Sequence, residues 1–192
     1  MGREFELKFR ASARQLTAIM ADFEGFREIS METTYYDTPE RSLAPLHWTL
    51  RRRLENGTSV CALKTPCADG GRCEWEVACP DITTGVGELC KLGAPEELKA
   101  LTSAGLDSLC IARFIRQAAL IELEAATVEL ALDRGILQGG ARIEFLAEVE
   151  VELKSGSETA AVAFARSLAA KYGLVEERSS KYQRALALAQ KR

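Results

Sequence analysis

The chain has 192 residues, of which 47% are hydrophobic and 28% are charged. This composition is typical of a globular protein, and the length predicts one domain, residues 1–192, with a substantial core. The formal net charge of −3 excludes the overall basic surface that duplex nucleic acid requires, so any anion site must concentrate Lys and Arg locally.

Apolar runs of membrane-spanning length are missing from the sequence, and its first residues are charged and strand-like. We therefore expect neither a membrane span nor a secretory signal. The six cysteines form no CxxC pair and His47 is the only histidine, so a zinc site is poorly supported. We predict a cytoplasmic protein whose cysteines are free thiols.

The elements predicted for the first half of the chain are mostly strands. A helical spacing of apolar residues follows Ser12, which suits a helix N-cap, and Asn56-Gly57 between two strand-like runs is a strong hairpin signal. In chain order we predict a strand at 3–10, a helix at 11–23, a strand at 28–38, a hairpin at 49–65 and a strand at 73–79.

The second half contains longer predicted elements. Residues 81–106 are rich in Gly, Pro and small side chains and are predicted to hold one short helix, near 95–105. There follow predicted strands at 110–123, 126–137 and 142–156, a helix at 157–174 capped by Ser155 or Ser157, and a helix at 179–192 with Ser179 near its cap. Because short links between strands favour antiparallel pairing, the predicted fold class is α+β.

The first predicted strand, REFELKFR, alternates charged and apolar side chains. Successive side chains of a strand point to opposite faces, so its apolar residues share one face and its charged residues the other. The apolar face consists of Phe5, Leu7 and Phe9, and the charged face includes Glu4, Glu6 and Lys8. Taken alone, this alternation is typical of a half-buried strand with its polar face in water.

Two later strands place like charges on one face. Glu148, Glu150 and Glu152 alternate with apolar residues, and Arg51 and Arg53 flank a single residue. Like charges two residues apart repel one another unless opposite charges offset them. A closed barrel would offset them if its apolar residues packed outward against helices. Inside, carboxylates would hold divalent cations and Lys and Arg would bind phosphate oxygens.

These strands resemble the motifs of the CYTH superfamily, also called triphosphate tunnel metalloenzymes. EFELK resembles the family's Glu-x-Glu-x-Lys signature, and further landmarks follow in order: LRRR, LKT, EWE, FIR, ALDRG, EVEVE and SSKY. The resemblance runs from residue 3 to about residue 184 and is greatest to the CYTH domain of bacterial inorganic triphosphatases. It implies a closed eight-stranded antiparallel β-barrel, the triphosphate tunnel, with surrounding helices. Those bacterial enzymes often carry a C-terminal helical CHAD domain. Whether activity of this chain depends on such a partner domain is left open.

The resemblance also implies roles for individual residues. The expected substrate-binding residues are Lys8, Arg51, Arg53, Lys64, Arg116 and Lys181. The expected ligands of Mg²⁺ or Mn²⁺ are Glu4, Glu6, Glu76, Asp133, Glu148, Glu150 and Glu152. Glu4 is further expected to position the attacking water, and Lys181 to donate a proton to the leaving group. Arg52 and Trp75 are expected to face away from the tunnel, and His47 to have no catalytic role. Arg113 and Arg116 lie at an odd separation in one strand, so we expect them to face opposite ways unless a bulge intervenes.

The implied activity is metal-dependent hydrolysis of inorganic triphosphate to pyrophosphate and phosphate. Four alternatives remain: a thiamine triphosphatase, a nucleoside triphosphatase, a class IV adenylyl cyclase and a non-catalytic polyphosphate binder. Tyr35, Tyr36 and Trp48 are aromatic residues that would stack an organic group in the tunnel or else pack in the barrel wall. We expect a triphosphate-bearing small molecule as partner, without duplex nucleic acid or membrane, and either a monomer or a homodimer.

Overall fold

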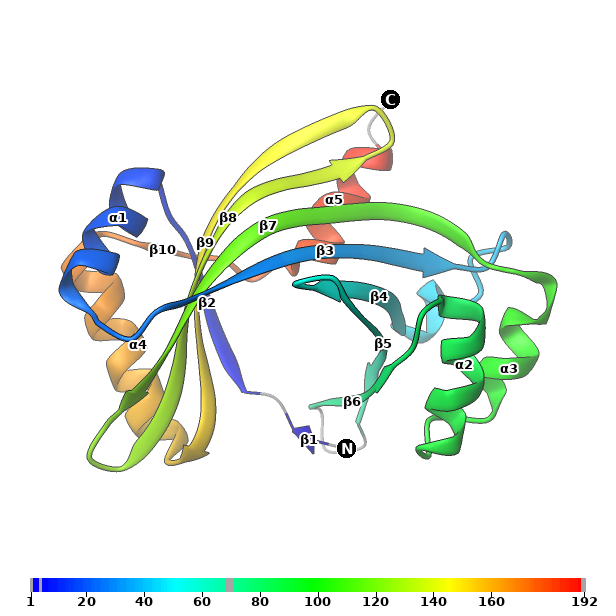
Figure 1. Cartoon of the computed structure of the whole chain (residues 1–192), viewed down its shortest axis with the longest axis horizontal. Coiled ribbons are helices and arrows are strands. Elements are labelled where there is room, and N and C mark those ends of the chain that lie inside the picture. The colour runs from blue at the N-terminus through cyan, green and yellow to red at the C-terminus, as the bar shows by residue number, and fades with distance from the viewer. Residues whose placement is uncertain (1, 4, 68–70, 191–192) are drawn as a thin grey trace.

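A single curled antiparallel sheet of ten strands dominates the computed structural model, which describes residues 2–3, 5–67 and 71–190 (Figure 1). The strands are β1 (Gly2–Arg3), β2 (Glu6–Arg10), β3 (Arg27–Asp37), β4 (Thr49–Glu55), β5 (Thr58–Pro66), β6 (Arg72–Ala78), β7 (Asp107–Glu122), β8 (Ala126–Gly139), β9 (Arg142–Gly156) and β10 (Val175–Glu176). The helices are α1 (Ala13–Asp22), α2 (Ile82–Lys91), α3 (Glu97–Leu101), α4 (Glu158–Tyr172) and α5 (Lys181–Gln190), with short 3₁₀ turns η1 (Ala44–Leu46) and η2 (Thr102–Ala104).

The N-terminal segment of the chain contributes a strand near each end of the sheet. The strand order is β1-β6-β5-β4-β3-β7-β8-β9-β2-β10, in which β1 pairs with β6 and β2 pairs with β9. The edge strands are β1 and β10, and no pairing between them is present among the described residues. The predicted α+β fold with an antiparallel barrel is confirmed as a curled sheet of ten strands, in which the first predicted strand is divided in two and β10 is a short pairing on β2.

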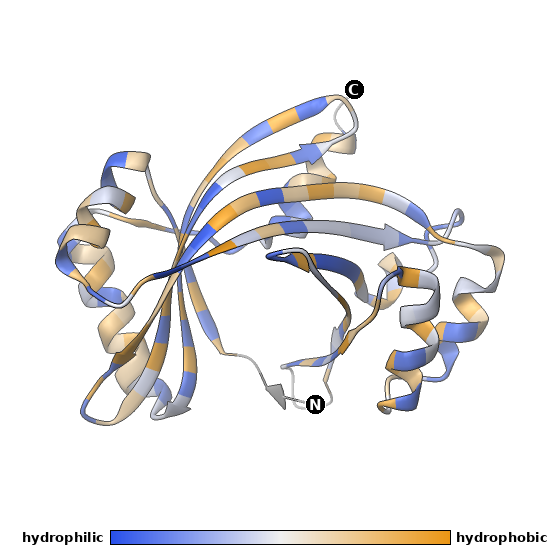
Figure 2. Ribbon diagram, viewed as in Figure 1, coloured by the Kyte–Doolittle hydropathy of each residue, from blue (hydrophilic) through white to orange (hydrophobic). Residues whose placement is uncertain are grey.

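Alternation of apolar and polar residues along the strands separates an outer core from an inner polar face (Figure 2). On the outside of β2, β8 and β9, Phe9, Leu130 and Val149 are buried against Ile19 of α1 and Ala165 of α4. Phe5 and Leu7 pack against the same cluster, as predicted for the apolar face of the first strand. The predicted caps are also present, since the side chain of Ser12 accepts from the amide of Gln15 and that of Ser157 from the amide of Ala160.

A second outer core lies under α2, a helix that was not predicted from the sequence. Asp81 caps this helix by accepting from the Thr84 amide at 2.9 Å. A Cβ atom at Gly85 would lie 2.6 Å from the sulfur of Cys61, so a glycine lets the helix approach β5 closely. Thr and Gly have low helix propensity, and packing of α2 on β5 and β6 overrides it. Trp75 packs in this outer cluster, as predicted.

Helix α5 packs on the inner side of the barrel. Ala185 and Leu188 of α5 lie in one buried cluster with Phe114, Leu137 and Leu146 of strands β7, β8 and β9. A capping box begins the helix one residue later than predicted: the Ser180 hydroxyl accepts from the Gln183 amide at 3.1 Å, and the Gln183 side chain accepts from the Ser180 amide at 2.8 Å. The inner position of α5 brings its first turn to the centre of the barrel.

The expectation that all six cysteines are free thiols is wrong for two of them. Cys67 and Cys73 form a disulfide with Cα atoms 5.4 Å apart, and Cys61, Cys79, Cys90 and Cys110 are free and buried. The β5–β6 hairpin brings the pair together, because Thr65 of β5 lies opposite Cys73 and the Cys67 amide donates to the Gly71 carbonyl at 2.8 Å. Sequence spacing alone does not reveal that pairing. Among the described helices, none has both the length and the apolar character to cross a membrane.

Candidate active site

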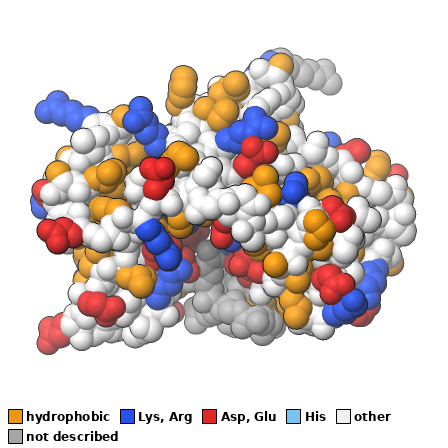
Figure 3. All heavy atoms as spheres, viewed as in Figure 1, with side chains coloured by type: hydrophobic (Ala, Val, Ile, Leu, Met, Phe, Trp, Pro, Cys, Tyr) orange, Lys and Arg blue, Asp and Glu red, His pale blue; other side chains and the backbone are white. Residues whose placement is uncertain are grey.

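A cavity of about 790 Å³ lies inside the curled sheet and is lined mainly by charged side chains. Figure 3 shows acidic and basic side chains around a hollow near the middle of the face in view. Among the described residues, ten basic side chains line the cavity: Lys8, Arg27, Arg51, Arg53, Lys64, Arg72, Arg116, Lys154, Arg178 and Lys181. Seven acidic side chains line it as well: Glu6, Glu55, Glu74, Glu76, Glu129, Glu150 and Glu152. The excess of basic groups favours an anionic ligand.

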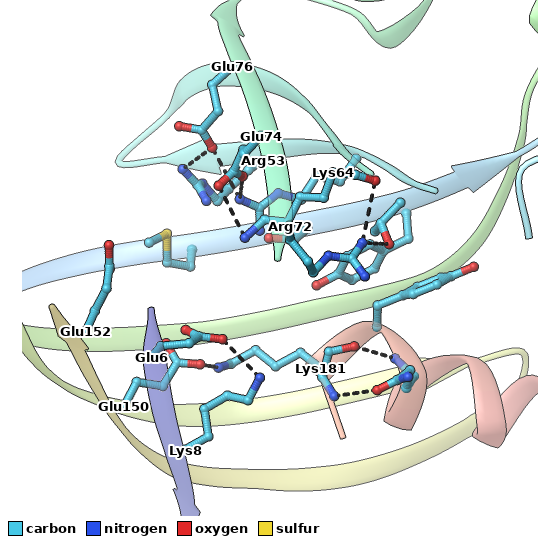
Figure 4. A pocket seen from close by; sticks show the side chains of 18 of the residues that line it. Glu6, Lys8, Arg53, Lys64, Arg72, Glu74, Glu76, Glu150, Glu152 and Lys181 are labelled. Carbon is cyan, nitrogen blue, oxygen red and sulfur yellow. Dashed lines mark hydrogen bonds and ion pairs between the residues drawn. The ribbon is translucent and has the colours of Figure 1, made fainter. Parts of the chain in front are cut away.

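Strands β4, β5 and β6 form a wall of the cavity that carries paired basic and acidic groups. Arg51 donates to Glu74 at 3.0 Å and to Glu76 at 3.2 Å, and Arg53 donates to Glu76 at 3.2 Å. The Lys64 ammonium lies 3.3 Å from Glu74. In Figure 4 Arg53, Lys64, Glu74 and Glu76 lie on one side of the cavity. We call Arg51, Arg53 and Lys64 the basic wall.

Arg53 is held in an environment that disfavours its positive charge. Burial lowers the pKa of its guanidinium, and the neighbouring Arg51 lowers that pKa further. The buried Nε atom of Arg53 pairs with Glu55 at 2.6 Å. An incoming anion would relieve the repulsion between the two guanidiniums. The basic wall is therefore suited to bind an anion such as phosphate.

The opposite side of the cavity carries carboxylates of β2 and β9, of which Figure 4 shows Glu6, Glu150 and Glu152, and a carboxylate of β8 borders it as well. Glu6 of β2 lies opposite Glu152 of β9, and Glu152 lies opposite Glu129 of β8. Each of the three lines the cavity, as does Glu150. We call Glu6, Glu129, Glu150 and Glu152 the acidic wall. Carboxylate oxygens converging from three adjacent strands are the donor set that Mg²⁺ and Mn²⁺ prefer, so these residues fit the predicted metal.

Glu129 was not among the predicted site residues. It is 9% exposed and borders the cavity, where it pairs with Arg27 at 3.2 Å and lies 3.8 Å from Lys154. The sequence did carry a signal for it, because Glu129 lies four residues before Asp133 and must share its face on a regular strand. The register between β8 and β9 identifies its partner, and that register is not visible in the sequence.

Behind the acidic wall, three acids surround the end of Lys181. Oxygens of Asp133, Glu148 and Glu150 lie within 4.8 Å of one another and could hold a metal ion. The Lys181 ammonium lies 2.8 Å from Asp133 and 2.6 Å from Glu150, and it also pairs with Glu148. Arg116 binds Asp133 in a bidentate manner, with both distances 2.7 Å. We call Asp133, Glu148 and Glu150 the lysine cage.

Electrostatics in the lysine cage favour the charged form of Lys181. Burial alone would lower the pKa of its ammonium, but Asp133, Glu150 and Glu148 together raise that pKa well above its ordinary value. Burial likewise opposes ionisation of Glu150, yet Lys181 and Arg116 lower the pKa of this carboxyl well below its usual range. Burial raises the pKa of Glu148 to about 7. The cage therefore binds Lys181 as a cation.

The structure brings most of the predicted site residues into one cavity. All six expected substrate-binding residues line it, together with Glu6, Glu76, Glu150 and Glu152 of the expected metal ligands. Glu76 stands on the β4–β6 wall, apart from the other three. Asp133 and Glu148 are fully buried and do not line the cavity, and Glu4 lies outside the described residues. The roles of these residues stay predictions.

The residues expected to face away from the tunnel do so. Arg52 donates to the Ser59 hydroxyl at 2.8 Å and does not line the cavity. Arg113 is exposed and pairs with Glu32 at 3.0 Å, whereas Arg116 lines the cavity, so the two face opposite ways as expected. Of the three aromatic residues considered for an organic group, Tyr35 and Trp48 line the cavity, whereas Tyr36 packs in the outer core under α2.

A model of the CYTH domain matches residues 2–186, which is nearly the whole chain. The chain belongs to the CYTH domain family. In this CYTH domain the motif residues of the first strand, of β4 and of β9 meet at the cavity described above.

Known proteins similar to this CYTH domain include enzymes that act on triphosphates. An inorganic triphosphatase of Haemophilus influenzae is 29% identical over 164 residues, which are 82% of this chain and 47% of that protein. The chain thus spans about half the length of this curated relative.

Solved structures share the fold at low sequence identity. A Pyrococcus horikoshii protein, PH1819, is 21% identical with a TM-score of 0.63, covering 96% of this chain and 98% of its own. HpAC1 from Hippeastrum, named for adenylyl cyclase and described by its dominant triphosphatase activity, is 17% identical with a TM-score of 0.62 over 93% of each chain. At these identities the likeness shows a common fold.

Proposed function

We propose that this CYTH domain hydrolyses inorganic triphosphate to pyrophosphate and phosphate with the help of Mg²⁺ or Mn²⁺. The observation that carries the proposal is Arg53, whose charge is disfavoured by burial and by the neighbouring Arg51, facing carboxylates across one cavity. A triphosphate bridged to metal ions would neutralise both walls. The similarity to an inorganic triphosphatase supports the same substrate.

Each wall has a task in this reaction. Phosphoryl transfer needs positioning and charge neutralisation more than covalent chemistry from the protein. Arg51, Arg53 and Lys64 would bind the oxygens of the pyrophosphate portion and stabilise the charge that develops when it leaves. A divalent ion held by the acidic wall would draw charge from the phosphate oxygens and lower the pKa of water.

Lys181 would stabilise the leaving group by its charge rather than by giving up a proton. Its pKa is raised well above the ordinary value by the three carboxylates of the lysine cage. A good general acid has a pKa close to the working pH, so a tightly held ammonium is a poor donor. We therefore propose a binding role for Lys181, in place of the proton transfer that the sequence suggested.

Phosphate release from a substrate panel tests the proposal. Inorganic triphosphate, thiamine triphosphate, ATP and a longer polyphosphate would each be supplied with Mg²⁺, with Mn²⁺ and with EDTA. We expect dominant release from triphosphate that EDTA abolishes. Glu6→Gln, Glu150→Gln and Lys8→Ala should abolish release, whereas Glu32→Gln on the outer face should leave it unchanged. Near-normal rates in the first three variants would refute the assignment.

A triphosphate with an organic group is the second candidate substrate. Tyr35 and Trp48 line the cavity, and the Tyr35 ring lies 5.1 Å from that of Tyr182. Aromatic faces of this kind can stack a heterocycle. Faster release from thiamine triphosphate or ATP than from triphosphate would favour this candidate. Formation of cyclic AMP would indicate a cyclase, and binding of polyphosphate without release of phosphate would indicate a binder.

A further inference from the structure

Helix α5 supplies two cations to a row of acids on β9. Lys181 and Arg184 lie three residues apart, which places them on the same side of the helix. Facing them are Glu144, Glu148 and Glu150, whose side chains point to the inner side of β9. The helix is therefore attached to the barrel by charge as well as by the apolar cluster around Leu188.

Arg184 approaches this row from the side away from the cavity. Its side chain is 8% exposed and is not among the groups that line the cavity. It donates to one oxygen of Glu148 at 2.8 Å and to Glu144 at 3.1 Å. Lys181 pairs with the other oxygen of Glu148. Two cations therefore bind Glu148, with Arg184 on one carboxylate oxygen and Lys181 on the other.

Lys181 fills the space between the three acids of the lysine cage. Its ammonium has three donors, and it contacts Asp133, Glu148 and Glu150. A divalent ion at the same place would have to displace an ammonium that the same carboxylates hold. On the cavity side, by contrast, Glu6 pairs with Lys8, Glu129 with Arg27 and Glu152 with Lys154, so each of these carboxylates lies beside a cation and none of them surrounds one.

We propose that Asp133 and Glu148 of the lysine cage position Lys181 instead of binding metal, and that Arg184 is a positioning residue that acts on Lys181 through Glu148. Metal would then bind only on the acidic wall. Asp133 and Glu148, which the sequence pattern suggested as metal ligands, would orient Arg116 and Lys181 toward the substrate. The predicted effect of Arg184 on the reaction rate rests on the proposed function, whereas the predicted location of the metal does not.

Binding of Mn²⁺ to the full chain tests the placement without any turnover. Bound Mn²⁺ would be counted by electron paramagnetic resonance in the wild type and in Glu148→Gln, Glu152→Gln and Lys181→Met. We expect Glu148→Gln to keep the wild-type affinity within about twofold and Glu152→Gln to lose more than about tenfold. Lys181→Met should bind one additional ion in the emptied cage. Thermal unfolding would verify that each variant is folded. If Lys181→Met does not fold, the comparison of Glu148→Gln with Glu152→Gln decides the result.

Two results of this titration would overturn the proposal. One is a loss of Mn²⁺ affinity in Glu148→Gln as large as that in Glu152→Gln, because Glu148 would then be a metal ligand. The other is unchanged affinity in Glu152→Gln, because the acidic wall would then not hold the metal.

Steady-state kinetics test the role of Arg184. For Arg184→Met we expect kcat for triphosphate to fall between about tenfold and about a hundredfold while KM stays within about twofold, since the basic wall is untouched. Arg184→Lys, which restores a cation, should recover part of the loss, and Arg113→Met on the outer face serves as the matched control. Because Arg184 acts through Glu148, Arg184→Met combined with Glu148→Gln should be little worse than Glu148→Gln alone.

The kinetic results separate a failure of this proposal from a failure of the proposed function. A raised KM at unchanged kcat, or fully additive losses in the double variant, would overturn the role of Arg184. If the wild type released no phosphate from triphosphate, the proposed function would fail, and the Mn²⁺ titration would still decide where metal binds.

Discussion

Replacing Arg53 by Met should weaken triphosphate binding strongly while leaving the fold about as stable as before. The positive charge of Arg53 is disfavoured in the free protein, since burial and the neighbouring Arg51 lower the pKa of its guanidinium. Methionine keeps most of the apolar stem of the side chain and removes the charge. The substitution therefore removes a group whose favourable contacts belong mainly to the bound state.

The expected magnitudes follow from the contacts of Arg53. Its ion pairs with Glu55 at 2.6 Å and with Glu76 at 3.2 Å involve acids that are 34% and 40% exposed, so each pair is worth at most about 1 kcal/mol. Removing the guanidinium also ends its burial penalty and its repulsion from Arg51, which offset the lost pairs, so the free energy of unfolding should fall by no more than about 2 kcal/mol. A lost charge-assisted hydrogen bond to phosphate costs about 1.5–3 kcal/mol, or about tenfold to about a hundredfold in affinity.

Calorimetric titration with triphosphate and thermal unfolding would measure the two effects side by side. Arg52→Met is the matched control, because Arg52 is the neighbouring residue of β4 and points outward to Ser59. We expect its affinity to match that of the wild type. An affinity of Arg53→Met within about twofold of the wild type, or a loss of more than about 3 kcal/mol in stability, would refute the reasoning.

Three further predictions concern the cysteines, the inner helix and the metal. Burial raises the pKa of Cys61 and of Cys110 to about 12, so at pH 8 both stay protonated and should resist iodoacetamide until urea unfolds the chain. Mass spectrometry of the unfolded chain should find four labels without reductant and six after reduction of Cys67–Cys73; six labels without reductant would exclude the disulfide. Gly139→Ala should lower both Tm and kcat, because the added Cβ would lie 2.2 Å from a backbone oxygen of α5, the helix that carries Lys181. A Tm equal to that of the wild type would contradict this close packing. Triphosphate with EDTA should still raise Tm through the basic wall, although less than triphosphate with Mg²⁺ does; equal shifts would argue against metal in the bound complex.

Some features of the fold escaped the sequence because they depend on packing. Helix α2 has a Thr-Thr-Gly-Val-Gly start that disfavours a helix locally, and it forms because Gly85 lets it pack against Cys61 on β5. The disulfide between Cys67 and Cys73 depends on the turn between β5 and β6. Neither residue spacing nor helix propensity predicts these contacts, because each contact depends on where a different helix, strand or turn is placed.

The sequence by itself determined which face of each strand is charged, because side chains of a strand alternate with a period of two. That period assigned Lys8, Arg51 and Arg53 to the cavity and Phe9 to the outer core, as the structure has them. Only the tertiary structure decided what each charged group faces across the barrel. Glu148 and Glu152 are equivalent in the sequence pattern, yet Glu152 faces the cavity and Glu148 faces α5. The physical reason is that ion pairing is set by distances between elements, and the docking of α5 on the inner face fixes those distances.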